Sequence, residues 1–231
     1  MFQSLLRFVK LKLLCDEFEL SETNNVANFE WCCGTTFTII GIIRDKETKM
    51  ETTAVLNLLI HGNQLKRSVR NGWVQRGVPN AENVAAHSYG VVFIALTLAQ
   101  IIEVVVDLEK VLIMAALHDL PEGLTTDIPT PAWRYLPTGI KTEVERGAMQ
   151  EIMSEVSFAP KMFAVWEELH VSETAESLLV HDADKLDMFI QAHMYAQQTG
   201  NRQLEEFWTI PYKFHYPQAQ AIYNLLRAQQ V

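Results

Sequence analysis

Two adjacent ionisable residues, His118 and Asp119, close the apolar run Val111–Leu117. An imidazole and a carboxylate are costly to bury unless a positive group holds them, and a divalent metal ion is a common such group. Two further acids, Glu122 and Asp127, follow shortly in the chain. Because an acid beside an activated water can move a proton, this pattern favours metal-assisted hydrolysis.

Two more candidate ligands, His87 and Asp184, lie on other segments. Two imidazoles and two carboxylates suit a borderline or hard divalent ion and leave positions for water and substrate. Each residue also has a structural alternative, because a histidine on an apolar helix is often a hydrogen-bonded core residue and a His-Asp pair can cap a helix. Asp182 and Asp187 compete with Asp184, so spacing alone leaves the last ligand open.

The segments that carry these residues have helical periodicity. Apolar spacing predicts helices at 52–66, from Asn80 or Asn83 to about 106, and at 107–119, 139–156, 160–169, 172–198 and 218–228. Asp107 is the expected N-cap of the third, and Gly200 the expected stop of the long one. With no internal repeat, this pattern predicts an all-α domain.

Residues 1–50 differ from the domain predicted at 51–231. They contain all three cysteines, Cys15, Cys32 and Cys33, and a β-leaning run at Thr36–Ile43. This part is either a short strand-bearing extension or a poorly ordered leader.

Charge and composition narrow the function classes. The 231 residues carry a net charge of -9, which argues against extended contact with a nucleic acid polymer, so anionic substrates must be small. An odd number of cysteines with an adjacent pair is typical of a reduced, cytoplasmic chain. The most apolar stretch, 91–102, is about half of the roughly 20 residues that a membrane span needs, so no membrane partner is expected.

The spacing of His87, His118-Asp119 and Asp184 resembles the H…HD…D signature of the HD-domain metal-dependent phosphohydrolase superfamily. Within it, several shorter motifs resemble those of the HD-domain 5'-deoxynucleotidases: Gly72-Trp73…Arg76, Glu82–Ser88, Glu122 and Asp127. The match spans about 52–198, and the run from His118 to Pro131 is its most specific part.

This resemblance implies a compact all-α helical bundle, a homodimer, and removal of the 5'-phosphate from deoxynucleoside monophosphates. It also implies one divalent cation, such as Co²⁺, Mn²⁺ or Mg²⁺, with His87, His118, Asp119 and Asp184 as metal ligands. Asp184 is preferred over its neighbours because Ala183–Leu186 matches the position of the family's last ligand.

The two acids after the HD pair are the catalytic candidates. Glu122 is expected to handle a proton, either from the attacking water or to the leaving 5'-oxygen. Asp127 resembles the second family acid, and it either orients the water or contacts the sugar.

The loop at 67–79 supplies substrate-binding candidates. Arg70 and Arg76 are candidates for a phosphate clamp, and Trp73 for an aromatic wall; in the alternative, Trp73 covers the core and the arginines are solvated. In the family, the phosphate-binding arginine immediately precedes the tryptophan, and here Gly72 stands in that place. The choice between the two arginines is therefore open. The aromatic cluster at 207–216 is expected to serve packing or a subunit contact; in the alternative, it lines a pocket.

Two other functions compete with a nucleotidase. A triphosphohydrolase of the same superfamily would need more basic residues around the polyphosphate than this acidic chain offers. A non-catalytic module that senses a nucleotide or metal would have no need of both Glu122 and Asp127.

Overall fold

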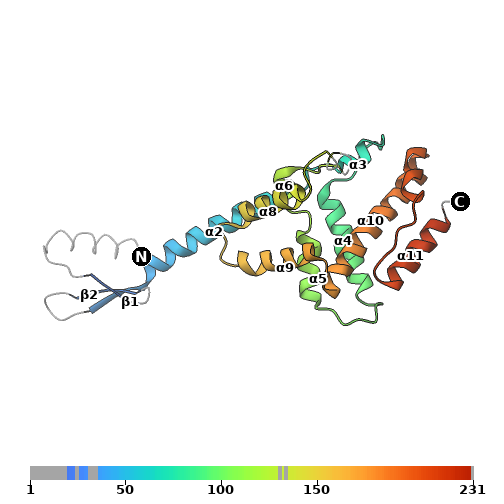
Figure 1. Ribbon diagram of the computed structural model, residues 1–231. Helices are drawn as coiled ribbons and strands as arrows, with labels where there is room; N and C mark the ends of the chain where they lie inside the picture. The colour runs from blue at the N-terminus through green and yellow to red at the C-terminus, as the bar shows by residue number, and fades with distance from the viewer. Residues whose placement is uncertain (1–19, 24–25, 31–35, 130–131, 133–134, 230–231) are drawn as a thin grey trace. The chain divides into compact units, whose positions relative to one another are not determined.

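The computed structural model describes residues 20–23, 26–30, 36–129, 132 and 135–229, and the chain divides into two compact units, Met1–Thr53 and Ala54–Val231. The first unit contains an antiparallel sheet of β1 (Leu20–Thr23), β2 (Val26–Glu30) and β3 (Thr36–Ile39), paired in that order (Figure 1). The β-leaning run ends earlier than expected, because helix α2 (Ile40–Gln64) takes over its last residues. The three cysteines lie outside the described residues.

The second unit is built from helices, as predicted. They are the C-terminal part of α2, then α3 (Asn71–Val74), α4 (Val84–Leu98), α5 (Leu108–Leu117), α6 (Glu122–Thr125), α8 (Ile140–Met153), α9 (Ala159–Val171), α10 (Ala175–Thr199), the 3-10 helix η1 (Arg202–Trp208) and α11 (Pro217–Ala228). In the described part of this unit, the only β-pairing is an isolated bridge between Val69 and Asn83. The all-α prediction for the domain is confirmed.

Local capping chemistry sets the helix boundaries. Asp107 caps α5, because its side chain accepts hydrogen bonds from the backbone amides of Glu109 and Lys110. Gly200 ends α10 in the left-handed conformation at φ +65°, as expected. The start of α10 was predicted too early: Thr174 provides the cap through a reciprocal capping box with Ser177.

Two other predicted boundaries were wrong. Helix α4 stops at Leu98, and the expected continuation to residue 106 does not form. The segment 101–106 contains five β-branched residues, which lose rotamer freedom in a helix. Helix α2 begins at Ile40 rather than at residue 52.

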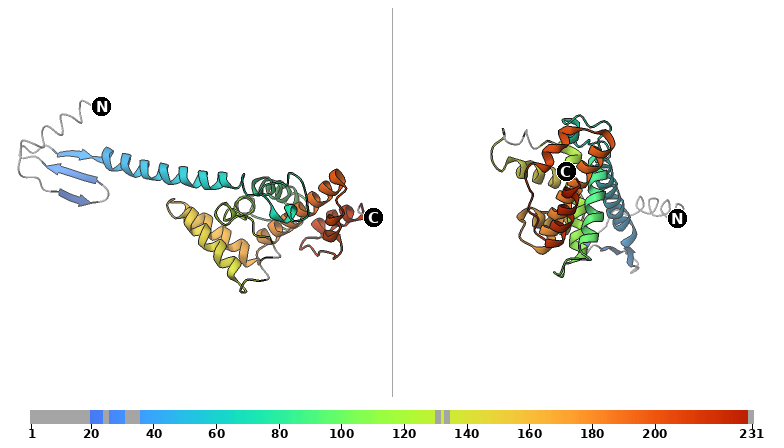
Figure 2. Two further views of the ribbon diagram at one scale, coloured as in Figure 1. Left: turned by 90° about the horizontal axis from the view of Figure 1, so that it is seen from above. Right: turned by 90° about the vertical axis from the view of Figure 1, so that its right-hand side faces the viewer.

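Helix α10 is the centre of the second unit, where it packs against α4, α5, α9, α11 and η1 (Figures 1 and 2). The three helices α4, α5 and α10 supply most of the principal core, with fully buried side chains that include Val91, Ala95, Leu98, Val111, Met114, Ala115, Leu179, Ala183 and Leu186. Burying this many apolar side chains provides the main stabilising free energy. The polar residues of the candidate site are therefore carried by the most tightly packed helices.

Asp182 joins α10 to the segment before α11. Its carboxylate is completely buried and accepts hydrogen bonds from the backbone amides of His215 and Tyr216, at 3.0 and 2.8 Å. The ring Nδ1 of His215 donates to the same carboxylate at 2.8 Å. Asp182, which competed with Asp184 as a candidate ligand in the sequence, is therefore a buried structural anchor.

Replacing Asp182 with Ala is expected to lower the free energy of unfolding by about 3 kcal/mol, because the amides of His215 and Tyr216 lose their buried acceptor. Asp182→Asn keeps one acceptor oxygen and should cost less. Urea denaturation of both variants measures the difference. An Ala variant as stable as the parent would contradict this anchoring role.

Candidate metal centre and active site

The ends of α4 and α5 meet the middle of α10 at the candidate site. His87 lies in the first turn of α4, whose start is set by Asn83, since the Asn83 side chain accepts from the amide of Ala86 at 2.9 Å. His118 and Asp119 directly follow α5. Asp184 lies within α10. The fold therefore brings together residues that are distant in sequence.

Three of the predicted ligands form one tight group. The Nε2 atoms of His87 and His118 are 3.2 Å apart, and the Asp119 Oδ2 atom is 3.2 Å from His118 Nε2 and 3.6 Å from His87 Nε2. Atoms bound to one ion at about 2.1 Å, with angles of about 90–110°, lie roughly 3.0–3.4 Å apart. These donor types and spacings fit a divalent metal ion.

Asp184 is placed differently from the other three. Its Oδ1 atom is 3.3 Å from His87 Nε2, while Oδ2 pairs with the Lys185 ammonium at 3.1 Å. The ligand atoms of His87, His118 and Asp119 all lie within 4.8 Å of one another, and Asp184 does not belong to this group. The structure thus places Asp184 beside one ligand of the tight group.

Hydrogen bonds orient both imidazoles. His118 Nδ1 lies 2.8 Å from the carbonyl oxygen of Ala115, which can only accept, so Nδ1 is the donor. His87 Nδ1 lies 2.7 Å from a carboxylate oxygen of Asp187 and also donates. Both Nε2 atoms therefore face the centre of the group, as metal coordination requires.

Buried charges at the site compensate one another. Burial opposes protonation of His87, but the carboxylates of Asp184 and Asp187 raise its pKa to about 9. Burial likewise opposes ionisation of Asp119, and the pKa of this carboxyl is nevertheless lowered, chiefly by His118 and also by His87 and Arg70. The Arg70 guanidinium contacts Asp119 at 3.2 Å.

Glu122 begins α6 and has the environment of a proton-handling acid. Its Oε2 atom is buried and has no hydrogen-bond partner. Burial, followed by the charges of Asp119 and Asp127, raises the pKa of Glu122 to about 8. The side chain therefore holds a proton at neutral pH, so it can donate one.

Asp127 ties the site to the loop at 67–79. Its Oδ2 atom accepts a 2.5 Å hydrogen bond from the backbone amide of Asn71, and the Asn71 side chain donates to its backbone carbonyl. The preceding Thr126 has a φ of +61°, an unfavourable value for a β-branched residue. These contacts hold the loop and the HD segment together.

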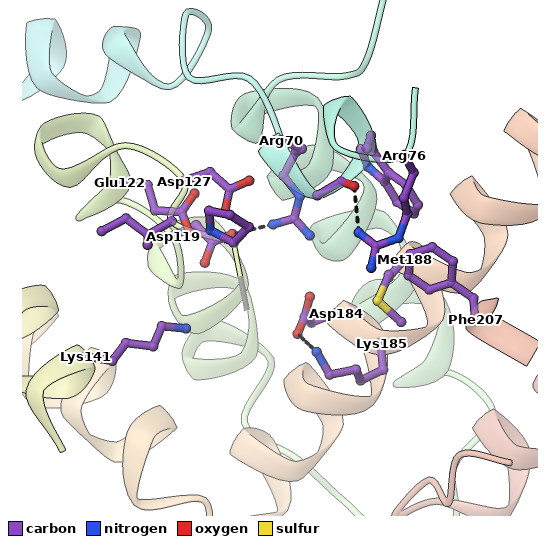
Figure 3. Close-up of a pocket in the computed structure, with 14 residues that line it drawn as sticks. Arg70, Arg76, Asp119, Glu122, Asp127, Lys141, Asp184, Lys185, Met188 and Phe207 are labelled. Carbon is purple, nitrogen blue, oxygen red and sulfur yellow. Dashed lines mark hydrogen bonds and ion pairs between the residues drawn. The ribbon is translucent and has the colours of Figure 1, made fainter. Parts of the chain in front are cut away.

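A cavity opens beside the ligand group (Figure 3). It is lined by the side chains or backbone of Arg70, Gly72, Trp73, Arg76, Asp119, Glu122, Asp127, Ile128, Pro129, Lys141, Asp184, Lys185, Met188 and Phe207. Figure 3 shows Arg70 with Asp119, Glu122 and Asp127 on one side, and Arg76 with Met188 and Phe207 on the other. All three predicted substrate-binding residues and both predicted catalytic acids line this cavity.

The two arginines and Trp73 make distinct contacts. Arg76 donates to the Gly72 carbonyl at 2.7 Å, pairs with Glu206, and lies 4.8 Å from the ring centre of Phe207. Trp73 is only 3% exposed, and its indole N–H donates to Glu82 at 2.9 Å. Trp73 is therefore a core residue that also borders the cavity. Neither arginine is simply solvated, because each pairs with a carboxylate.

Several cavity residues were not predicted as site residues. Lys185 lines the cavity directly after Asp184 in sequence, so its position could have indicated it. Asp187 is not among the cavity-lining residues; it lies one helical turn after Asp184 and contacts His87. Lys141 comes from the distant helix α8 and carries no local signal. Phe207 belongs to the aromatic cluster for which packing or a subunit contact was expected and pocket lining was the alternative; it packs against Trp73 and also lines the cavity.

The HD-domain family model matches residues 62–223, so this chain belongs to the HD-domain family. It is 32% identical to 5'-deoxynucleotidase HDDC2 of Danio rerio, over 72% of this chain and 83% of that protein. The corresponding protein of Dictyostelium discoideum is 33% identical, over 67% and 86%. A solved structure, a conserved hypothetical protein from Pyrococcus furiosus, has 41% identity and a TM-score of 0.59 over 66% of this chain and 85% of that one. The predicted superfamily membership is confirmed.

Metal binding at pH 7 is expected to release about one proton, because His87, with a pKa near 9, must lose its proton before Nε2 can bind an ion. Apparent affinity for Mn²⁺ should rise as pH rises from 7 towards 9 and then level off. Calorimetric titration in buffers of different ionisation enthalpy counts the protons. Binding without proton release at pH 7 would contradict a protonated His87 in the metal-free protein.

Proposed function

We propose that this protein is a metal-dependent phosphomonoesterase that removes the 5'-phosphate of deoxynucleoside monophosphates. The observation that carries the proposal is the group of His87, His118 and Asp119 beside the protonated Glu122 and the Arg70 guanidinium. This chain matches two relatives over most of their length, and both are named 5'-deoxynucleotidases. The activity of this chain is inferred from that similarity together with the site.

We propose His87, His118 and Asp119 as ligands of one divalent ion, with Asp184 as the fourth. Co²⁺, Mn²⁺ and Mg²⁺ are the candidate ions, because the donors are imidazoles and carboxylates. When bound, such an ion supplies positive charge for the phosphate oxygens and makes water a better nucleophile. Lys185 keeps Asp184 ionised, since its ammonium is the main group that lowers the pKa of that carboxyl against the effect of burial.

Glu122 is the proposed proton donor to the leaving 5'-oxygen. Its raised pKa supports this choice over removal of a proton from water, because a carboxylic acid that is protonated at neutral pH is ready to donate. Asp127 is proposed to act mainly by holding the Arg70 loop, through its bond to the Asn71 amide. It also borders the cavity and is available for contact with the sugar.

Arg70 is the proposed phosphate clamp. Its guanidinium contacts Asp119, so it lies next to the atoms that would hold the ion. The backbone amide of Arg70 donates to the Glu82 carbonyl at 3.0 Å, which fixes the loop against the start of α4. Arg76 and Phe207 lie further along the cavity and are proposed to contact the sugar or base.

The charge balance of the cavity argues against a triphosphohydrolase. Four cationic side chains line it, but each pairs with a carboxylate: Arg70 with Asp119, Arg76 with Glu206, Lys141 with Glu145 and Lys185 with Asp184. Little positive charge is left for a polyphosphate. A non-catalytic sensing module is the remaining alternative, and the protonated Glu122 argues against it.

Three organisational proposals accompany the activity. A homodimer is supported by the exposed, stacked rings of Tyr89 and Phe93 on α4, since exposed apolar patches of this kind often form contacts between proteins. Sedimentation of the purified protein measures its oligomeric state.

The proposed division of the chain into an extension at 1–50 and an HD domain at 51–231 is tested by limited proteolysis. Cytoplasmic location is supported by the cysteine pattern and is tested by fractionation. Among the described residues, no helix is long and apolar enough to span a membrane.

The proposed activity is tested by phosphate release from 5'-deoxynucleotides, ribonucleotides and one deoxynucleoside triphosphate with added Mn²⁺ or Co²⁺. Asp119→Ala should abolish release, and Glu122→Gln should lower kcat by about 10²–10⁴-fold. Glu103→Gln is the matched control, because Glu103 is exposed and outside the cavity. Release of pyrophosphate or triphosphate would indicate the triphosphohydrolase instead, and metal binding without any turnover would indicate the sensing module.

The arginine assignment is tested in the same assay. Arg70→Ala should lower kcat/KM for the monophosphate about 100-fold, whereas Arg76→Ala should mainly raise KM, by about 5–10-fold. Arg202→Ala serves as a control, because that side chain is largely exposed. If Arg76→Ala costs more than Arg70→Ala, the phosphate lies at Arg76.

A further inference from the structure

Two carboxylates from one helix contact the two nitrogens of a single imidazole. On α10, Asp184 Oδ1 lies 3.3 Å from His87 Nε2, and Asp187 Oδ2 lies 2.7 Å from His87 Nδ1. Residues three apart on a helix share a face, so both carboxylates point towards α4. The His87 side chain is completely buried. Its ring orientation is therefore determined by groups within the protein.

Gly90 provides the space for Asp187. It lies one turn after His87 on α4, and a Cβ atom at this position would be 2.0 Å from Asp187 Oδ1 and 2.8 Å from Cγ. Both distances are far below a normal contact, so the carboxylate occupies the volume that any other side chain would need. The exposed Gly147 of α8 has no atom within 4 Å of the corresponding position. Crowding at Gly90 is therefore not a general property of glycines in these helices.

A second cation site at this position is a weaker explanation. Glu82, His87 and Asp187 offer ligand atoms within 4.8 Å of one another. However, the proton on His87 Nδ1 points at Asp187, and Glu82 already accepts from the Trp73 indole at 2.9 Å. The short bond from His87 to Asp187 is better explained as an orienting contact.

We propose that Asp187 is a positioning residue, seated against Gly90, that accepts the Nδ1 proton of His87 and thereby keeps Nε2 directed at His118 and Asp119. The inference rests on the proposed metal centre and deepens it. Hydrogen-bond partners of this kind fix the tautomer of a ligating histidine, and their loss typically weakens metal binding about 10–100-fold. Gly90 has its effect only through Asp187.

Calorimetric titration of the full chain with Mn²⁺ tests the proposal. Asp187→Ala should weaken binding about 10–100-fold, and Asp187→Asn, which keeps an acceptor oxygen, should weaken it less. Gly90→Ala should weaken binding as well, although it removes no functional group. The double variant should be no worse than Asp187→Ala alone, because both changes remove the same contact. Gly147→Ala is the matched control and should bind like the parent.

A second measurement separates orientation from a general loss of structure. In the metal-free protein at pH 10, ¹⁵N spectra of the histidine rings should show His87 protonated at Nδ1 in the parent and as a mixture of tautomers in Asp187→Ala. Thermal melting checks that each variant is folded. An unchanged tautomer in Asp187→Ala would overturn the proposal, as would additive effects of the two substitutions on Mn²⁺ affinity.

These outcomes are distinguishable from failure of the proposed function. A parent protein that binds Mn²⁺ but hydrolyses no nucleotide would refute the nucleotidase and leave the role of Asp187 intact. If the parent binds no metal, the metal centre is refuted, and the tautomer measurement still decides whether Asp187 orients His87.

Discussion

The burial of opposite charges where α4, α5 and α10 meet is the constraint on which the rest of the site depends. An imidazole or a carboxylate placed there is stable only if a partner of suitable charge or hydrogen-bonding capacity accompanies it. Arg70 and Lys185 provide that partner for Asp119 and Asp184. Glu122 has no such partner for its buried oxygen and keeps its proton instead. The same constraint thus produces both the ionised carboxylates and the protonated acid.

Helix α10 uses its different faces for separate tasks. At about 100° per residue, Asp184 and Asp187 lie roughly 60° apart around the helix, while Asp182 and Asp184 lie about 160° apart. Asp182 consequently anchors the segment before α11, whereas the other two acids contact His87 on α4. A single helix therefore anchors a neighbouring segment with one carboxylate and contacts His87 with two others.

The helices of the domain were largely predictable, because apolar periodicity and capping residues are local signals. Asp107 caps the start of α5 and Gly200 ends α10, as the sequence predicted. The errors came where local signals conflict: the segment 91–106 is mostly apolar, but its second half is rich in β-branched residues and is not helical. Thr174 caps α10 through reciprocal hydrogen bonds with Ser177. The helix propensities of single residues do not indicate such a pair, so the start of α10 was predicted too early.

The sequence alone determined the chemical types at the site and the segments that carry them, since His118, Asp119 and Glu122 are linked by short spacing next to an apolar helix. It did not separate the roles of Asp182, Asp184 and Asp187 without a family resemblance, and it contained no signal for Lys141. Only the tertiary structure decided these points. Contacts between helices depend on how their faces pack, and a close approach such as that at Gly90 exists only once α4 and α10 are side by side.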